Sequence, residues 1–326
     1  MRVLVTGATG FTGGHLARTL ARRGYAVRGL ARLASQGAAL QTAGIEPVIG
    51  SLGDRSALAR AVKDVDVVYH IAAVYRQAGV SNDTYRAVNA DAVGHLIESA
   101  AAAGVQRFVH CSTVGVHGDI EHPPANEDAP LRPGDIYQVT KVAGEQIARE
   151  AAARTGLGVT IARPSGIYGP GDRRLLKLFR GIARRRFVVL GSGNIFYHLT
   201  YIDDLVEGLR LCGESAAAAN RTYILAGGEV TTLNQLITLI AAEAGVAPPR
   251  LKLPVWPFWI AGAACEALCV PFGIEPPIYR RRVDFFTKSR AFDISRARAE
   301  IGYAPQVGLI GGIRATLSWY KERGWL

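Results

Sequence analysis

The chain has 326 residues, of which 49% are hydrophobic, and carries a formal net charge of +11 at pH 7. A chain of this length and composition is globular rather than disordered, and it can form an α/β core together with a smaller lobe. The basic residues are spread along the chain and no recognised nucleic-acid module is visible. The expected partners are therefore anionic small molecules or anionic lipid surfaces, and not nucleic acid.

The N-terminus and the cysteines further restrict the class of protein to which the chain can belong. No long apolar run precedes the first predicted strand, so we expect no signal peptide and a cytoplasmic protein. The four cysteines have neither zinc-ligand nor disulfide spacing, and Cys265 and Cys269 lie one helical turn apart in an apolar stretch. We therefore expect free thiols and no metal site.

A strand, a glycine-rich turn and a helix open the chain. The apolar strand Met1–Thr6 leads into a turn with glycines at positions 7, 10 and 13, and a helical apolar pattern follows from Leu16. Such glycines allow a tight turn and a close backbone approach, so that free N–H groups at the helix start can face a pyrophosphate. The pattern predicts a dinucleotide-binding loop formed by Gly7, Thr9, Gly10, Phe11, Thr12 and Gly13.

The second predicted strand, Tyr25–Ala31, indicates which dinucleotide binds. NAD sites usually end this strand with an acidic residue that binds the adenine ribose, whereas an arginine nearby accommodates the 2′-phosphate of NADP. Here the strand is followed by Arg32 and no carboxylate. We therefore expect NADP in preference to NAD.

Strands and helices alternate as far as Pro170, which is typical of a doubly wound parallel sheet, the Rossmann fold. Beyond Pro170 this rhythm breaks, and we expect residues 198–202 and 222–225 to return to the core sheet. Residues 1–170 with 197–226 are predicted to form the dinucleotide-binding domain, and 171–196 with 227–326 a smaller α+β substrate lobe. The predicted strands are 48–49, 65–70, 107–111 and 158–163, and the predicted helices are 56–62, 83–103 and 135–154.

Tyr137 and Lys141 are spaced for acid/base chemistry on the last of these helices. Positions i and i+4 of a helix share a face, so the Lys141 ammonium can lower the pKa of Tyr137 from its reference value of about 10. A phenol tuned in this way can act as a general acid and base near neutral pH.

The ordered motifs resemble those of the extended short-chain dehydrogenases/reductases, also called the NAD-dependent epimerase/dehydratase family. Thr6–Gly13 resembles the glycine loop of the family, and Arg163–Asp172 resembles the segment beside the nicotinamide. Ser51 departs from the Gly-Asp-Leu that the family often has beside the adenine. Further matches are Gly50–Leu52, His70–Ala73, Asn89, Cys111–Thr113 and the pair Tyr137 and Lys141.

This resemblance implies a role for each matched residue. Tyr137 would be the acid/base, Lys141 would also bind the nicotinamide ribose, and Thr113, with Ser112 as the alternative, would hydrogen-bond the reacting oxygen. These roles argue against the alternative that the chain is a cofactor-binding protein that has lost turnover. The other residues implied at the cofactor are Ser51, Leu52, Ile71, Ala72, Ala73, Asn89, Pro164, Gly166 and Ile167.

The residues that this chain lacks help to distinguish between the reactions that the family catalyses. Its sugar dehydratases read Ser-Thr-Asp-Glu where this chain has Val114 and Gly115 in the last two positions, so dehydration is not expected. Nucleotide-sugar epimerases commonly hold the diphosphate with an arginine where Tyr197 or His198 stands here. The basic residues between 173 and 186 either replace that arginine or form a solvated helix face.

An apolar, aromatic stretch covers residues 253–272 and resembles the C-terminal lobe of 3β-hydroxysteroid-dehydrogenase-like and dihydroflavonol-reductase-like members. Three interpretations of this stretch are open. It forms a core helix, it forms the wall of an apolar substrate cleft together with Phe196 and Tyr197, or it forms a helix that rests on a membrane surface. We expect a homodimeric NAD(P)-dependent oxidoreductase that interconverts a secondary alcohol and a ketone on an apolar small molecule. The alternative is a nucleotide-sugar 4-epimerase with a tightly retained NAD.

Overall fold

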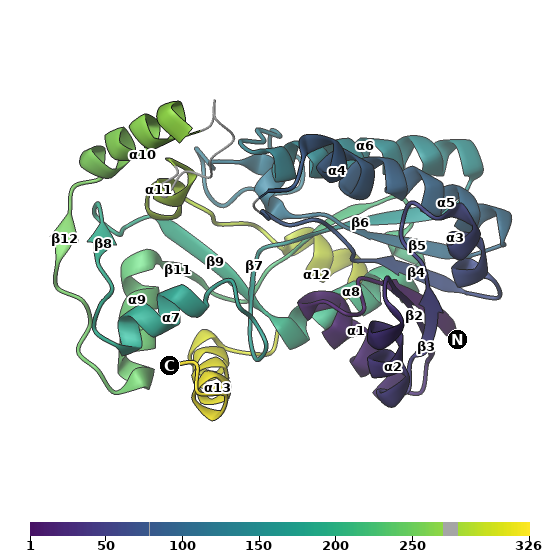
Figure 1. The fold of residues 1–326 in the computed structure, drawn as a ribbon, viewed down its shortest axis with the longest axis horizontal. Coiled ribbons are helices and arrows are strands. Elements are labelled where there is room, and N and C mark those ends of the chain that lie inside the picture. Colours follow the sequence, from purple (N-terminus) through teal and green to yellow (C-terminus); the bar gives the residue numbers. More distant parts are fainter. Residues whose placement is uncertain (78, 270–279) are drawn as a thin grey trace.

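The computed structural model describes residues 1–77, 79–269 and 280–326 (Figure 1). Its centre is a parallel sheet of seven strands in the order β10-β6-β5-β4-β1-β2-β3. This confirms the predicted doubly wound α/β fold. The strands are β1 (Arg2–Thr6), β2 (Ala26–Ala31), β3 (Glu46–Ile49), β4 (Val67–His70), β5 (Arg107–Cys111), β6 (Gly158–Pro164) and β10 (Thr222–Leu225).

Helices cover both faces of this sheet (Figure 1). Successive side chains of a strand point to opposite faces, so β1 contributes to two cores. Val3 and Val5 pack with α1, α2 and α8, whereas Leu4 packs with α3, α5 and α6. The helices are α1 (Phe11–Arg22), α2 (Ala34–Thr42), α3 (Arg55–Val62), α4 (Asn82–Arg86), α5 (Ala92–Ala102), α6 (Ile136–Thr155) and α8 (Ile202–Glu214), with a π-helical turn at Ala87–Asp91 between α4 and α5.

The smaller lobe lies at one end of the sheet. It contains a sheet ordered β11-β9-β7 and the strand pair β12-β8. Its elements are β7 (Gly166–Tyr168), α7 (Leu176–Ala183), β8 (Val189–Leu190), β9 (Phe196–Tyr201), β11 (Val230–Thr232), α9 (Leu233–Ala244), β12 (Lys252–Leu253), α10 (Trp256–Cys269), α11 (Arg280–Thr287) and α13 (Leu309–Glu322).

One of the two strands expected to return to the core sheet does so. Thr222–Leu225 forms β10 and pairs with β6, which confirms that prediction. The prediction for 198–202 is wrong: these residues belong to β9 and the start of α8, and β9 pairs in parallel with β7 and antiparallel with β11. Because β6 is already flanked by β5 and β10, it offers no free edge to β9.

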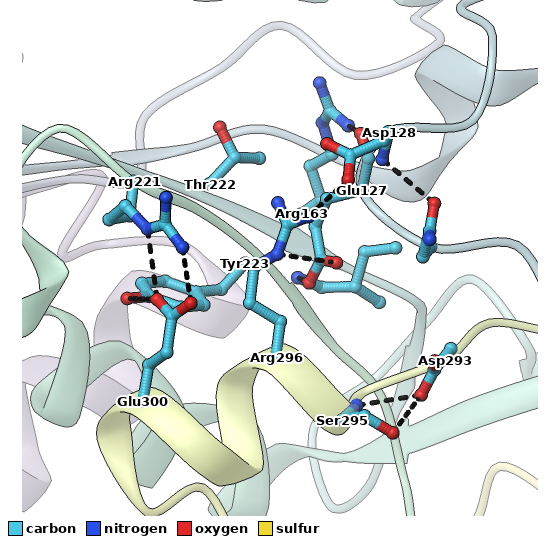
Figure 2. A network of polar contacts seen from close by, with 12 residues as sticks. Glu127, Asp128, Arg163, Arg221, Thr222, Tyr223, Asp293, Ser295, Arg296 and Glu300 are labelled. Atoms are coloured by element: carbon cyan, nitrogen blue, oxygen red, sulfur yellow. Dashed lines mark hydrogen bonds and ion pairs between the residues drawn. The ribbon is translucent and has the colours of Figure 1, made fainter.

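Helix α12 (Ser295–Ile301) ties the end of the chain to the core. It packs against β10, although it follows the lobe in sequence. Figure 2 shows the ion pairs that hold it, Arg221 with Glu300 and Arg296 with Asp128. The phenol of Tyr223 on β10 also donates to Glu300 at 2.8 Å.

Helix α10 is not a core helix. It packs against α11 at the outer edge of the lobe (Figure 1). Gly262 is its one buried residue. Residues 270–272 of the apolar stretch lie outside the described residues.

Candidate active site

A cleft of about 1180 Å³ runs along the carboxyl-terminal ends of β1, β2, β4, β5 and β6 and against the lobe. Ligands of open α/β sheets bind at this edge. Of the residues predicted to form the site, those that line the cleft are Gly7, Thr9, Gly10, Phe11, Thr12, Gly13, Arg32, Ser51, Leu52, Ile71, Ala72, Ala73, Thr113, Tyr137, Pro164, Gly166 and Ile167. Asn89 and Lys141 do not line it.

The glycine loop turns tightly between β1 and α1. Gly7 has a φ of +70°, and a Cβ on Gly13 would lie 2.3 Å from the carbonyl oxygen of Gly7. A larger residue at position 13 would therefore push the first turn of α1 off the loop. Gly10 precedes α1 and supplies no side-chain cap, so N–H groups of the first turn are free to bind a phosphate.

Asn89 organises the cleft wall from behind. Its amide accepts from Val74 N at 2.8 Å and donates to Val74 O at 3.0 Å and to Thr140 Oγ1 at 3.2 Å. The side chain therefore links the loop after β4 to helix α6 instead of facing the cleft. The resemblance to the family predicted that Asn89 belongs to the site. It did not predict that the Asn89 amide would point away from the cleft.

The predicted acid/base residues meet at the ends of β5 and α6. Tyr137 and Thr113 both line the cleft, and Asp135 caps α6 by accepting from Gln138 N at 2.9 Å. Thr113 Oγ1 accepts from Gly115 N at 3.0 Å, which leaves its own hydrogen available to a ligand. Ser112, the alternative, already donates to the buried Glu145 at 2.6 Å.

The effect of Lys141 on the pKa of Tyr137 stays a prediction, and the Lys141 side chain reaches the end of β5. Its ammonium is buried and donates to Cys111 O at 2.7 Å. Burial raises the pKa of the Tyr137 phenol, and the charges that oppose this rise belong to Arg76 and Arg174. Burial also lowers the pKa of Lys141.

Tyr75 and Arg76 were not predicted, whereas Arg174, which also lines the cleft, belongs to the basic residues between 173 and 186 that the sequence singled out. The rings of Tyr75 and Tyr137 meet edge to face at 4.9 Å, and the Arg76 guanidinium pairs with Asp135 at 2.9 Å. Tyr75 and Arg76 lie in the loop that follows β4, so their position in a loop after a parallel strand was the available signal.

The lobe side of the cleft is aromatic. Tyr197 packs on Phe285 at 5.3 Å between ring centroids, and Phe285 packs on Phe286 at 5.0 Å. The sequence predicted Tyr197 correctly in this wall. Phe196 is 40% exposed and does not line the cleft, and neither does any described residue of α10. Helix α11 supplies the ring surface that the sequence assigned to α10.

The cleft is electropositive. Six basic side chains line it against two acidic ones, which favours anionic ligands. The basic residues are Arg32, Arg76, Arg174, Lys177, Lys288 and Arg290, and the acidic ones are Asp135 and Asp284. Within the described residues there is no group of three His, Cys, Asp or Glu side chains placed to hold a metal ion.

Comparison with known sequences shows the family to which this chain belongs. The sequence model described as "NAD dependent epimerase/dehydratase family" matches residues 3–226. The chain belongs to this family. The chain is an NAD-dependent enzyme of the epimerase/dehydratase family.

Relatives within the epimerase/dehydratase family include reductases and dehydrogenases. The chain is 31% identical to a 2-alkyl-3-oxoalkanoate reductase of Stenotrophomonas maltophilia, covering 96% of this chain and 98% of the relative. It is 30% identical to a 3-beta-hydroxysteroid dehydrogenase of Mycolicibacterium neoaurum, covering 98% and 92%. The crystal structure of a protein named gox2253 superposes with a TM-score of 0.84 at 30% identity and covers 99% of each chain.

Proposed function

We propose that this family member is an NADP-preferring oxidoreductase that interconverts a secondary alcohol and a ketone on an apolar small molecule. The observation that supports this most directly is that the Tyr137 phenol shares one cleft with the glycine loop and with an aromatic wall. Such a wall binds apolar skeletons because their surface leaves water.

The residues of the cleft fit a nicotinamide dinucleotide. The uncapped N-terminus of α1 suits the pyrophosphate, and Ser51 and Leu52 line the cleft beyond Arg32. The Ser165 hydroxyl is buried in the wall beside Pro164 and Gly166 and has no hydrogen-bond partner among the described residues. A buried hydroxyl of this kind is matched by a polar group of the ligand.

The reaction needs one proton and one hydride to move. A nicotinamide dinucleotide held by the glycine loop and Arg32 would supply the hydride acceptor for oxidation of the alcohol and the hydride donor for reduction of the ketone. Tyr137 takes the proton of the substrate hydroxyl as the phenolate in oxidation, and as the neutral phenol it gives the proton to the carbonyl oxygen in reduction. Thr113 donates its free hydrogen to the same oxygen, and Lys141 supports α6 beneath Tyr137 through Cys111 O.

NADP preference rests on Arg32. Its guanidinium lines the cleft after β2, and no carboxylate follows that strand. A planar guanidinium binds a phosphate through two hydrogen bonds, so the 2′-phosphate of NADP has a partner that NAD cannot use.

The named activities of the two relatives agree with this proposal, since one name specifies a 3-oxo group and the other a 3-hydroxy group on a steroid. The second candidate is a nucleotide-sugar 4-epimerase with retained NAD. The excess of basic side chains in the cleft favours it, because a diphosphate needs such partners.

One experiment separates the two candidates. The purified protein is analysed for retained nucleotide and then assayed with NADPH or NADH against 3-oxo acids, steroid ketones and UDP-sugars. Net oxidation of NADPH by an apolar ketone supports the oxidoreductase. Retained NAD, together with interconversion of UDP-sugars and no net change in nicotinamide absorbance, would replace it by the epimerase.

A further inference from the structure

Arg290 is a cation of the cleft with no ion-pair partner among the described residues. Two of its neighbours in the cleft are already paired, Arg76 with Asp135 at 2.9 Å and Lys288 with Asp284 at 3.0 Å. Arg290 is only partly exposed, so its guanidinium loses hydration without gaining a protein anion. A partly desolvated guanidinium of this kind is a ready partner for an anionic ligand.

Arg290 also lies on the substrate side of the cleft. Its backbone N–H donates to Phe196 O at 2.9 Å, and the residue forms a parallel bridge with Tyr197. Burial raises the pKa of Tyr197 to about 12, and the Arg290 charge acts against this rise. Tyr197 belongs to the aromatic wall, so a cation and an apolar surface stand next to each other there.

We propose that Arg290 binds a carboxylate on the substrate, which makes the substrate an apolar hydroxy acid or oxo acid. This inference rests on the proposed oxidoreductase function and deepens it. A carboxylate accepts both hydrogen bonds of a guanidinium fork, and the aromatic wall covers the remaining hydrocarbon.

The test compares a long-chain 3-hydroxy acid with its methyl ester, oxidised by the purified full-length enzyme with NADP or NAD. The ester keeps the reacting alcohol and the chain but lacks the charge. We expect the wild type to show a KM about 10- to 100-fold lower for the acid, which is the range of a hydrogen bond to a charged group. Arg290→Gln should raise the KM for the acid toward that of the ester, and Arg290→Lys should keep part of the preference.

Arg314→Gln serves as the matched control, because Arg314 pairs with Glu243 on the surface, away from the cleft. Equal KM values for acid and ester in the wild type would overturn the carboxylate site while leaving the oxidoreductase intact. An equal loss of acid and ester oxidation in folded Arg290→Gln protein would also overturn it, as would Arg290-dependent binding of UDP-sugars. If neither compound, nor any ketone or alcohol of the panel, is turned over, the proposed function itself fails.

Helix α10 carries a second, independent inference. Its most exposed large side chains are Trp256, Trp259, Ile260 and Leu268, at 66%, 50%, 54% and 70% exposure. Residues 256, 260, 264 and 268 follow each other at helical spacing and form one face, which is apolar throughout. An apolar exposed face of this extent marks an interaction surface.

We infer that this face of α10 rests on an anionic lipid bilayer. The helix has 14 residues, and no helix among the described residues is long and apolar enough to cross a membrane, so it would lie in the interface. Tryptophan favours that interface. Exposed Arg250 and Lys252 precede the helix and complement anionic headgroups.

Docking in this orientation would bring the cleft to the lipid. Helix α10 packs against α11 (Figure 1). Phe285 and Phe286 of α11 line the cleft. An apolar substrate dissolved in the bilayer would then reach the aromatic wall without crossing bulk water.

Co-sedimentation with phosphatidylcholine vesicles, with and without phosphatidylserine, tests this surface. Wild-type protein should sediment with the phosphatidylserine vesicles, and the variant Trp256→Ser/Trp259→Ser/Leu268→Ser should stay in solution with its activity on a water-soluble substrate unchanged. Ile310→Ser on α13, where Ile310 is 48% exposed, is the matched control and should sediment like wild type.

Absence of wild-type binding, or binding that the triple variant retains, would overturn the membrane surface. It would equally be overturned if light scattering in lipid-free buffer shows a dimer that the triple variant dissociates, because a second copy of the chain would then cover the face.

Discussion

The guanidinium of Arg163 donates two hydrogen bonds to the carboxylate of Glu145, one from Nε at 2.9 Å and one from Nη2 at 2.6 Å. Both side chains are almost fully buried. Ser112 donates to the same carboxylate at 2.6 Å. Arg163 also donates to the backbone of Glu127, which belongs to the polar network shown in Figure 2. The pair therefore fixes the ends of β5 and β6, which border the cleft, to helix α6, which carries Tyr137.

Replacing Glu145 should destabilise the protein strongly. Glu145→Ala leaves Arg163 charged and buried without its partner, and we expect the free energy of unfolding to fall by about 3–5 kcal/mol. Urea denaturation measures this loss. The control is Glu243→Ala, which breaks a surface ion pair with Arg314 and should change stability little. Equal effects of the two substitutions would contradict the role given to the buried pair.

Two buried histidines should make the protein less stable in mild acid. His70 and His110 stack at 5.6 Å, and burial, assisted by the Lys141 charge, lowers the pKa of His70 to about 3 and that of His110 well below 6.5. Both rings stay neutral in the folded protein while the unfolded chain takes up protons below pH 6.5. Stability is therefore full above pH 6.5 and falls as the pH drops, by up to about 1.4 kcal/mol per pH unit for each ring.

His110→Leu should flatten this acid dependence. Neither ring nitrogen of His110 has a hydrogen-bond partner among the described residues, so the substitution removes a proton-binding group and no hydrogen bond. Unfolding free energies measured between pH 6.5 and 5 should fall less steeply in the variant than in wild type. A slope unchanged by the substitution would mean that His110 does not carry this proton linkage.

Tyr137→Phe should abolish most of the turnover. The substitution removes the hydroxyl that carries the proton and keeps the ring that packs on Tyr75. We expect kcat to fall by at least about 10²-fold, with affinity for NADPH nearly unchanged. Steady-state kinetics and a fluorescence titration of NADPH measure the two quantities. Wild-type turnover in the variant would remove Tyr137 from the acid/base role.

Arg32→Ala should erase the preference for NADP. Wild-type protein should bind NADPH more tightly than NADH, because the 2′-phosphate supplies the only added contact. The variant should lose NADPH affinity and keep its NADH affinity, as followed by calorimetry. Equal affinities for the two nucleotides in wild type would contradict the NADP preference and would mean that the adenine end of the cleft is an NAD site.

Local sequence determined the elements that form the nucleotide half of the cleft. The glycines of 7–13 and the alternation of apolar strands and helices predicted β1, α1 and the parallel sheet, because backbone freedom and hydrophobic periodicity act over a few residues. The spacing of Tyr137 and Lys141 likewise placed both on one helix. Their electrostatic coupling could not be obtained this way, since it depends on Lys141 donating to Cys111 O on another element.

Tertiary structure decided most of the substrate half, in which the sequence had predicted Tyr197. Strand β9 pairs with β7 because β10 occupies the free edge of β6, a competition between segments far apart in sequence. Both α10 and α11 contain aromatic residues, yet Phe285 and Phe286 of α11 line the cleft while Trp256 of α10 stays exposed to solvent. Composition specifies that such side chains leave water, but the packing of the lobe against the sheet determines which of them line a cleft and which remain on the surface.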